Sequence, residues 1–461
     1  KAMLKAVFEG LQVPMDLALK IEARYFTQIL QSKEARAMIR SLFVSMGELN
    51  KGARRPAAVP ASSLKKIGVL GAGFMGAGIA SVSASAGLQV VLIDRDLEAA
   101  TKGKGHIEKT LSDQVAKGRM KGAARADYAD LKDVDLIIEA VFEDRDVKKA
   151  ATQNAEAHIG KDVIFASNTS TLPISSLAEN STRPEQFVGI HFFSPVEKML
   201  LVEIIKGKKT GDKAIATAMD FVRLIKKTPI LVNDTRGFYI NRCVLNYMLE
   251  SNLMLMEGVP PAMIENLAKQ AGMPVGPLAL CDETGVDLGW KIIQATKKDL
   301  GEGAVNPVQE KLFEALVVKG QRFGRKNGKG FYDYPQAGQK KLWPGLADIA
   351  GKRLDADSIN KAELKLRFLV TIALEAARAV EQGVITDVRE ADVGSILGFG
   401  FAPFTGGALS YIDGMGVKAF VGLCESLAAR HGTRFAPTGL LQDMAAKGES
   451  FYGRFPATKA A

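Results

Sequence analysis

The sequence has little cysteine, little histidine and no long apolar run. Its three cysteines lie far apart along 461 residues without a CxxC pair, and only four histidines accompany them. This scarcity argues against a disulfide framework and against a metal site, so we expect neither, and a reducing compartment fits. No apolar run approaches the roughly 18 residues that cross a bilayer. We therefore also expect no membrane span.

Charge and length narrow the class of protein further. Lys and Arg outnumber Asp and Glu by 61 to 51, and the net charge of +10 favours an anionic partner such as nucleic acid, a membrane surface or a phosphorylated small molecule. Zinc-finger spacing and an RNP-type aromatic motif are both missing, so we expect no nucleic acid partner. The composition is globular, with 47% hydrophobic and 24% charged residues, and 461 residues predict more than one domain.

The pattern of the sequence changes at several points along the chain. Residues 1–50 show amphipathic helical spacing, and residues 51–63 (KGARRPAAVPASS) form a basic connector that we expect to be exposed. Over residues 64–236 short apolar runs alternate with helical stretches, which predicts a Rossmann-type α/β domain with helices on both faces of a parallel sheet. Helical periods then predict an all-α domain of two units, 237–345 and 346–461. Because the chain begins with Lys, and its first helices have no strands to cover, we expect a fragment of a longer polypeptide.

The two helical units resemble each other at a shift of 125 residues (367 − 242). The shift aligns an Arg, a Glu and a Gly at matching places in two apolar helices: Arg242 with Arg367, Glu250 with Glu375, and Gly258 with Gly383. A chance match of two amphipathic helices is the alternative. In the repeat Asn241 has Leu366 as its counterpart, so we expect the second unit to cover the first rather than to carry a second active site.

A glycine-rich loop follows the first predicted strand of the α/β part. Residues 67–70 (IGVL) lead into GAGFMG at 71–76, and a helical stretch follows. A GxGxxG motif that leaves a strand and opens a helix is typical of dinucleotide binding. Gly71 lets the strand turn, Gly73 clears the helix N-terminus for a pyrophosphate, and Gly76 allows close packing of helix and sheet. A tight turn without any nucleotide is the alternative.

Asp94 ends the second predicted strand, 18 residues (94 − 76) after the third glycine. An acid at about this distance accepts hydrogen bonds from the adenosine ribose and disfavours the additional phosphate of NADP. Arg95 follows it and softens this preference. The sequence therefore predicts NAD as the cofactor, in preference to NADP.

A histidine and a glutamate stand out in two apolar segments. His191 lies at the end of the predicted strand in GIHFFSP, where ligands meet the chemistry of open α/β sheets. Glu203 lies inside LLVEII, and a carboxylate there is costly to bury without a partner. His191 is the available partner, and a salt bridge of Glu203 with Lys198 or Lys206 is the alternative. An imidazole beside a carboxylate suits general base catalysis near neutral pH.

Residues 66–334 resemble the L-3-hydroxyacyl-CoA dehydrogenases of fatty-acid β-oxidation. The matching motifs, in order, are GAGFMGAGIA, IIEAVFED, FASNTSTLPI, GIHFFSPV, LVEII, DTRGFYINR and GPLALCDETGVD. The flanking helical parts further resemble multifunctional enzymes in which an enoyl-CoA hydratase/isomerase domain precedes the dehydrogenase. The resemblance implies NAD-dependent oxidation of a 3-hydroxyacyl-CoA to a 3-oxoacyl-CoA, most of the hydratase domain being absent here. It also implies an acyl-CoA substrate and a thiolase subunit as partner.

The resemblance also implies roles for individual residues. His191 would be the general base, Glu203 would orient it, Ser170 would donate near the substrate oxygen, and Asn241 would contact the reacting group. Further positions match those that line the nicotinamide half of the cofactor: Met75, Val141, Phe142, Glu143, Lys148 and Ser194. Ser194 departs from the pattern, since many relatives have HFFNP where this chain has HFFSP. Thr110 and Lys117 match positions that contact CoA, although a solvated helix face would explain the same charges.

Two other functions stay open at this point. The segment could be a scaffold that binds CoA esters or a thiolase without useful chemistry, or a different hydroxyacid dehydrogenase on a similar plan. The presence of Ser170, His191, Glu203 and Asn241 together argues against the scaffold. The last residues, ATKAA, are not a peroxisomal signal, so we expect a cytoplasmic protein.

Overall fold

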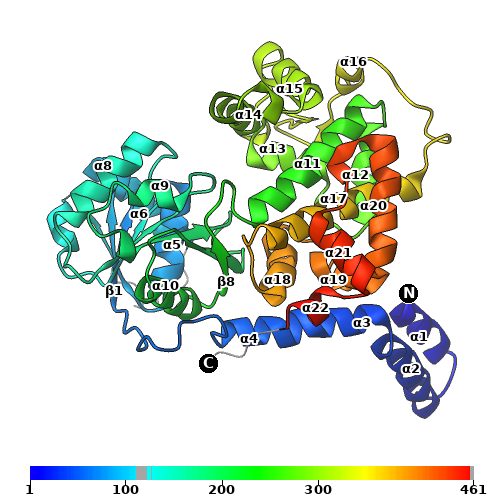
Figure 1. Ribbon diagram of the computed structural model, residues 1–461, viewed down its shortest axis with the longest axis horizontal. Coiled ribbons are helices and arrows are strands. Elements are labelled where there is room, and N and C mark those ends of the chain that lie inside the picture. The colour runs from blue at the N-terminus through cyan, green and yellow to red at the C-terminus, as the bar shows by residue number, and fades with distance from the viewer. Residues whose placement is uncertain (111–121, 126, 457–461) are drawn as a thin grey trace.

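A sheet domain and a larger helical domain lie side by side, with the first helices of the chain running beneath the helical domain (Figure 1). The computed structural model of the protein describes residues 1–110, 122–125 and 127–456. Among these described residues, no helix is both long enough and apolar enough to cross a membrane.

The sheet contains β1 (Lys66–Leu70), β2 (Gln89–Ile93), β3 (Gly122–Arg125), β4 (Leu136–Glu139), β5 (Ile164–Ser167), β6 (Phe187–Phe192), β7 (Leu201–Lys206) and β8 (Thr228–Asn233). Their order is β3-β2-β1-β4-β5-β6-β7-β8. Neighbouring strands from β3 to β6 are parallel, as the alternation of strands and helices predicts.

The sheet departs from the expected wholly parallel arrangement at β7, which is antiparallel to β6. Residues 193–200 join these two strands, and such a short connection cannot form the crossover of about a dozen residues that parallel strands need. β8 then pairs with β7 in parallel. The antiparallel register places His191 directly opposite Glu203.

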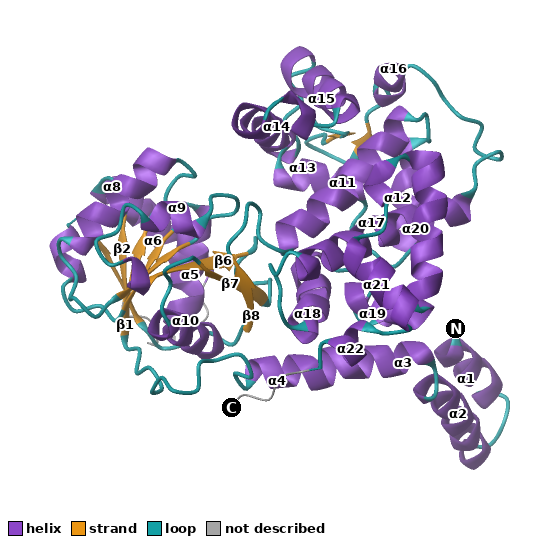
Figure 2. Ribbon diagram, in the orientation of Figure 1, coloured by secondary structure: helices purple, strands orange, loops and turns teal. Residues whose placement is uncertain are grey.

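Helices cover both faces of the sheet (Figure 2): α5 (Phe74–Ser85), α6 (Leu97–Thr110), α8 (Arg145–Glu156), α9 (Ile174–Ala178) and α10 (Asp212–Leu224). Alternate residues along each strand point to opposite faces. Ile67 and Val69 of β1 therefore share one apolar cluster with residues of α5 and α10. Leu70 belongs to the other cluster, together with residues of α8 and α9.

The helical domain is built around α11 (Ile240–Met256) and α17 (Lys361–Glu381). The first unit continues with α12 (Pro261–Gln270), α13 (Pro277–Thr284), α14 (Val286–Leu300), α15 (Pro307–Phe313) and a small hairpin of β9 (Tyr332–Asp333) and β10 (Lys341–Leu342). The second contains α16 (Leu346–Ala350), α18 (Val388–Phe399), α19 (Ala408–Met415), α20 (Val417–His431), α21 (Gly439–Lys447) and α22 (Phe451–Arg454).

The central helices of the two units form reciprocal ion pairs. Arg242 of α11 pairs with Glu375 of α17 at 2.6 Å, and Arg367 of α17 pairs with Glu250 of α11 at 2.5 Å. These are the four charged residues that the sequence repeat aligns, each Arg now meeting the Glu of the other unit. Such exchange is expected when two copies of one helical unit pack on each other, and it favours the repeat over a chance match.

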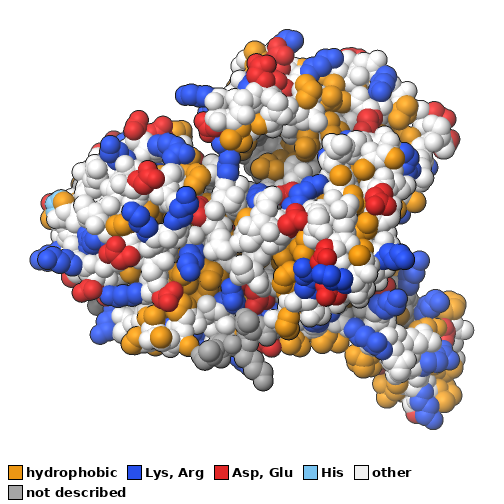
Figure 3. Space-filling model, viewed as in Figure 1, with side chains coloured by type: hydrophobic (Ala, Val, Ile, Leu, Met, Phe, Trp, Pro, Cys, Tyr) orange, Lys and Arg blue, Asp and Glu red, His pale blue; other side chains and the backbone are white. Residues whose placement is uncertain are grey.

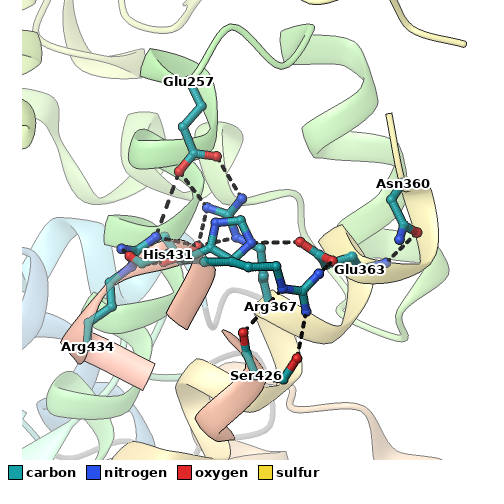
Figure 4. A network of polar contacts seen from close by, with 9 residues as sticks. Glu257, Asn360, Glu363, Arg367, Ser426, His431 and Arg434 are labelled. Carbon is teal, nitrogen blue, oxygen red and sulfur yellow. Dashed lines mark hydrogen bonds and ion pairs between the residues drawn. The ribbon is translucent and has the colours of Figure 1, made fainter. Parts of the chain in front are cut away.

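The pair at Arg367 is the centre of a larger polar network (Figure 4). The Arg367 guanidinium also binds Glu257 at 2.7 Å, and Arg434 reaches Glu250 at 2.7 Å. The side chains of Arg367 and Glu250 are each only 1% exposed. Two arginines and two glutamates balance their charges here, which makes the burial of these groups tolerable.

Glycine residues of the segment 398–407 lie at close contacts within the helical domain. A side chain at Gly400 would meet the ring of Pro274 in the first unit, and one at Gly407 would lie 2.5 Å from Asp392. The segment therefore forms part of the contact between the two helical units.

The N-terminal helices are α1 (Ala2–Gly10), α2 (Met15–Leu30), α3 (Lys33–Met38) and α4 (Met46–Asn50), with a π-helical turn at Ile39–Ser45. No residue of α1 or α2 is buried. The connector after α4 is only partly exposed, contrary to expectation, because Arg55 binds Asp220 of α10 at 2.7 Å and the neighbouring Arg54 binds Glu390 of α18 at 3.2 Å. These contacts fix the connector to both domains.

We predict that Arg367→Met lowers the free energy of unfolding by about 3 kcal/mol. The loss lies at the low end for a broken buried pair because Arg434 still neutralises Glu250. Urea unfolding followed by circular dichroism measures it. The matched variant Arg242→Met, whose pair is more exposed, should cost less; equal stability of Arg367→Met and the unmodified protein would contradict the role given to the network.

Candidate active site

The glycine loop joins β1 to the N-terminus of α5. Gly71 has φ +95°, a conformation that favours glycine, and a Cβ there would lie 2.6 Å from the carbonyl oxygen of Ala140. A Cβ at Gly76 would overlap the carbonyl oxygen of Gly71. At Gly73, by contrast, no atom beyond its adjacent residues lies within 4 Å of the position of a Cβ. The loop therefore keeps open space in front of the amides that begin α5, which is the space a pyrophosphate needs.

Asp94 lies next to this loop at the end of β2. Its Oδ2 accepts a hydrogen bond of 2.6 Å from the amide of Ala72, and Oδ1 accepts one from the amide of Arg95. The guanidinium of Arg95 is 85% exposed and pairs with Asp96. Asp94 is therefore held at the side of the glycine loop, the place expected for a ribose-binding acid.

The residues expected around the nicotinamide lie near the ends of β4 and β6 and at the start of α5. Met75 is half-buried and packs against the sheet core. Val141 is half-buried, Phe142 is 75% exposed, and Ser194 is exposed just beyond β6. Glu143 and Lys148 form an ion pair at 3.4 Å. These positions share one edge of the sheet, where the carboxyl ends of the parallel strands meet.

His191 and Glu203 are hydrogen-bonded across the antiparallel strand pair. His191 Nδ1 lies 2.8 Å from Glu203 Oε2, and the two residues are 3% and 0% exposed. The other oxygen of Glu203 accepts bonds from the amides of Tyr239 and Ile240 at 3.1 and 3.0 Å. These amides begin α11, whose positive dipole end favours a carboxylate. Glu203 therefore joins the sheet domain to the helical domain, and neither Lys198 nor Lys206 takes the place of His191.

Aromatic rings fix the orientation of the imidazole. The rings of Phe193 and Phe238 lie 4.5 and 5.8 Å from that of His191 between centroids, both tilted by 56°. Phe238 has φ +49°, which is uncommon for an aromatic residue. Such backbone strain is concentrated at functional sites.

Ser170 and Asn241 come from different domains and meet directly. Asn241 Nδ2, on the first turn of α11, donates to the carbonyl oxygen of Ser170 at 2.9 Å. Asn168, in the same loop as Ser170, accepts a hydrogen bond from the amide of Phe192, which follows His191. The four expected catalytic residues are thus connected through short contacts at the junction of the two domains.

Cys243, one turn after Tyr239, does not add nucleophilic chemistry to this junction. It is fully buried, and burial raises the pKa of its thiol well above the ordinary value. A thiol in this state is inert.

The structure adds residues that the sequence did not predict. Glu139, 1% exposed at the end of β4, binds Lys148, and Thr169 donates to Glu143 at 2.7 Å. A glutamate in the apolar run LIIE is a signal of the same kind as Glu203, so the sequence does contain a hint of its buried position. The amides of Tyr239 and Ile240 had no signal in the sequence, since any residue supplies an amide.

The side chains of the two expected CoA-binding residues lie outside the described part of the structure. Thr110 is the last residue of α6. Lys117 lies outside the described residues. Both stay predictions.

A glycine loop at a helix N-terminus, an acid beside it and a buried imidazole–carboxylate pair together define a dinucleotide-dependent dehydrogenase. Comparisons with known proteins give the family. A model of the NAD-binding domain of 3-hydroxyacyl-CoA dehydrogenase matches residues 66–235, and a model of the C-terminal domain of that enzyme matches residues 237–334.

Relatives of known sequence or structure agree. The fatty acid oxidation complex subunit alpha of Shewanella amazonensis is 38% identical over 463 residues, covering 98% of this chain and 65% of that protein, so the chain spans less than two thirds of its length. The (S)-3-hydroxybutyryl-CoA dehydrogenase of Ralstonia eutropha is 33% identical, with a TM-score of 0.55, and its structure covers 59% of this chain and is itself covered completely. The 3-hydroxybutyryl-CoA dehydrogenase of Escherichia coli shares the fold, with a TM-score of 0.71 at 24% identity over 84% of this chain and 99% of its own.

The chain belongs to the 3-hydroxyacyl-CoA dehydrogenase family and is an NAD-dependent oxidoreductase. The predicted fold class, a Rossmann-type domain followed by an all-α domain, is confirmed, and so is the choice of NAD as cofactor.

We predict opposite outcomes for two glycine substitutions in the loop. Gly73→Ala should keep the melting temperature of the unmodified protein but weaken NADH binding by about tenfold or more, because its methyl group occupies only the space of the pyrophosphate. Gly76→Ala should instead lower the melting temperature, because its methyl group overlaps the backbone at Gly71. Differential scanning fluorimetry and NADH fluorescence titration measure the two effects. Unchanged NADH affinity in Gly73→Ala would contradict the assignment of the loop.

Proposed function

We propose that this protein oxidises L-3-hydroxyacyl-CoA to 3-oxoacyl-CoA in fatty-acid β-oxidation, with NAD as hydride acceptor. The observation that carries the proposal is the hydrogen bond between His191 and the buried Glu203, beside the loop that bears Ser170. Family membership supports the class of substrate, and the names of the relatives support the pathway.

His191 is the proposed general base. Because the Glu203 carboxylate can only accept, Nδ1 of His191 carries the proton of their hydrogen bond, and Nε2 is left with a free lone pair. Nε2 removes the hydroxyl proton of the substrate while hydride leaves the carbon that bears this hydroxyl group. Glu203 then stabilises the imidazolium, because its negative charge lies 2.8 Å from the ring.

Ser170 and Asn241 are the proposed contacts to the substrate oxygen. Asn241 uses one N–H for the carbonyl of Ser170, which fixes its amide group and leaves the second N–H available. Ser170 is itself exposed, in the loop that follows β5. Groups held in advance by such contacts lower the barrier by positioning the reacting oxygen.

The proposed cofactor residues are Gly71, Gly73, Met75, Gly76, Asp94, Val141, Phe142, Glu143, Lys148 and Ser194. The open space at Gly73 fits a dinucleotide, which supplies the hydride-accepting ring when bound. Ser194 presents a hydroxyl where many relatives have an amide. The hydroxyl donates one hydrogen bond or accepts one there, and the N–H donors of an asparagine amide are lost.

The acyl chain of the substrate has a proposed path between the domains. Figure 3 shows a hollow between the sheet domain and helices α13 and α14, with hydrophobic side chains in its depth. Leu245 lies one turn beyond Asn241 on α11 and is 39% exposed. For the CoA part we propose Thr110 and Lys117 as contacts. The net charge of +10 attracts the negatively charged phosphates of CoA toward the protein.

The wider organisation is proposed from the resemblance and from the relatives. Residues 64–236 form the NAD-binding domain, and 237–345 and 346–461 form the two helical units. Residues 1–50 are the end of a preceding hydratase domain, and 51–63 connect it to the dehydrogenase. A thiolase subunit is the proposed partner, in line with the complex named for the relatives. The proposed location is cytoplasmic, which fits three cysteines that are all free and buried.

The assay follows NADH absorbance with acetoacetyl-CoA. His191→Ala should reduce kcat by about a hundredfold to ten-thousandfold, and Glu203→Gln by about a hundredfold or more because the imidazolium loses its counter-charge. His158→Ala, a change at an exposed histidine of the same domain, should leave turnover unchanged. Full activity in both site variants would contradict the assigned roles, and turnover of free 3-hydroxy acids but not of CoA esters would contradict the substrate class.

A further inference from the structure

A lysine and two glutamates are gathered at the ends of β4 and α8, beside the proposed nicotinamide position. Lys148 Nζ lies 2.8 and 3.1 Å from the two oxygens of Glu139 and 3.4 Å from Glu143 Oε2. The side chains of Lys148 and Glu139 are each 1% exposed, whereas that of Glu143 is 36% exposed. The ammonium group is thus held between an inner and an outer carboxylate.

The inner carboxylate has a complete set of partners besides the lysine. Glu139 Oε2 accepts from Ser167 Oγ at 2.6 Å, and Oε1 accepts from the amide of Val141 at 2.8 Å. Ser167 ends β5, Val141 follows β4, and Lys148 lies in the first turns of α8. One buried carboxylate therefore fixes three segments of the sheet edge. Burial raises the pKa of Glu139, while the ammonium of Lys148 acts to lower it.

The outer carboxylate, Glu143, connects Lys148 to the loop that contains Ser170. Glu143 Oε1 accepts from Thr169 Oγ1 at 2.7 Å and from the amides of Ser170 and Thr171 at 3.0 and 3.2 Å. Burial acts to raise the pKa of Glu143, but Lys148 and these hydrogen bonds outweigh it, so that the pKa lies below the ordinary value. A continuous chain of contacts runs from Glu139 through Lys148 and Glu143 to the backbone of Ser170.

We propose that Glu139 is a positioning residue for the dehydrogenase reaction, acting through Lys148. It fixes the ammonium toward Glu143, so that the cofactor contact at Lys148 and the substrate contact at Ser170 are held in one arrangement. This inference rests on the proposed function, in which Lys148 and Glu143 line the nicotinamide and Ser170 contacts the substrate. Glu139 itself touches neither, because Lys148, Ser167 and Val141 take up its carboxylate oxygens.

The test is a double-mutant cycle of Glu139→Gln and Lys148→Met in the full chain. The glutamine keeps the shape and an oxygen acceptor but removes the counter-charge of the lysine. We expect Glu139→Gln to weaken NADH binding, measured by fluorescence titration, and to raise KM for NADH in the acetoacetyl-CoA assay, each by about tenfold. KM for acetoacetyl-CoA should change less than about threefold, because Glu143 keeps its own hydrogen bonds to the Ser170 loop. In the Lys148→Met background the same change should have little further effect, because the path through the lysine is already broken.

Additive losses in the cycle would overturn the inference, and so would NADH affinity in Glu139→Gln equal to that of the unmodified protein. Glu179→Gln, at an exposed residue of the same domain, controls for the loss of a negative charge. Ser167→Ala, which removes one hydrogen bond and no charge, is a milder second variant in case Glu139→Gln does not fold. It should weaken NADH binding a few-fold and lower the melting temperature only slightly. Unchanged NADH binding in this variant would also overturn the inference. NADH titration needs no turnover, so a protein that binds NADH but does not react with acetoacetyl-CoA would contradict the proposed function separately.

Discussion

The antiparallel pairing of β6 and β7 is the constraint on which the site depends. It reverses the direction of the sheet after the parallel strands and places His191 opposite Glu203. A carboxylate buried this deeply needs several donors, and it finds them in one imidazole and two amides at the start of α11. The same group that orients the proposed base therefore also fixes the helical domain against the sheet. Orientation of the base and arrangement of the domains cannot be changed independently.

The second helical unit stabilises this junction through contacts with α11 and with the sheet. Arg242, next to Asn241 on α11, pairs with Glu375 of α17, and the hydroxyl of Tyr239 donates to the carbonyl of Ala391 at 2.9 Å. Glu390 of α18 in turn accepts from the amide of Leu231 in β8. The second unit thus contacts both the helix that carries Asn241 and the edge of the sheet. Leu366 at the place of Asn241 in the repeat is consistent with a supporting rather than a catalytic unit.

Local patterns in the sequence predicted much of this arrangement. The glycine loop is readable because its function depends on the absence of side chains at Gly71, Gly73 and Gly76, and the fold class follows from the alternation of strands and helices. The pairing of His191 with Glu203 was predictable from the cost of burying a lone carboxylate. The antiparallel direction of β7 was not predicted, although the short connection between the segments that carry His191 and Glu203 leaves too few residues for a parallel crossover. The chain from Glu139 to Ser170 joins residues of separate strands, and only the folded structure brings them together.

In the proposed mechanism Glu203 orients His191 so that Nε2 faces the reacting oxygen beside Asn241. A crystal structure of the protein with NAD and acetoacetyl-CoA tests it most directly. The 3-oxo oxygen should lie within about 3.5 Å of both His191 Nε2 and the Asn241 amide. A bound ligand whose 3-oxo oxygen contacts neither group, with the imidazole turned away from Glu203, would contradict it.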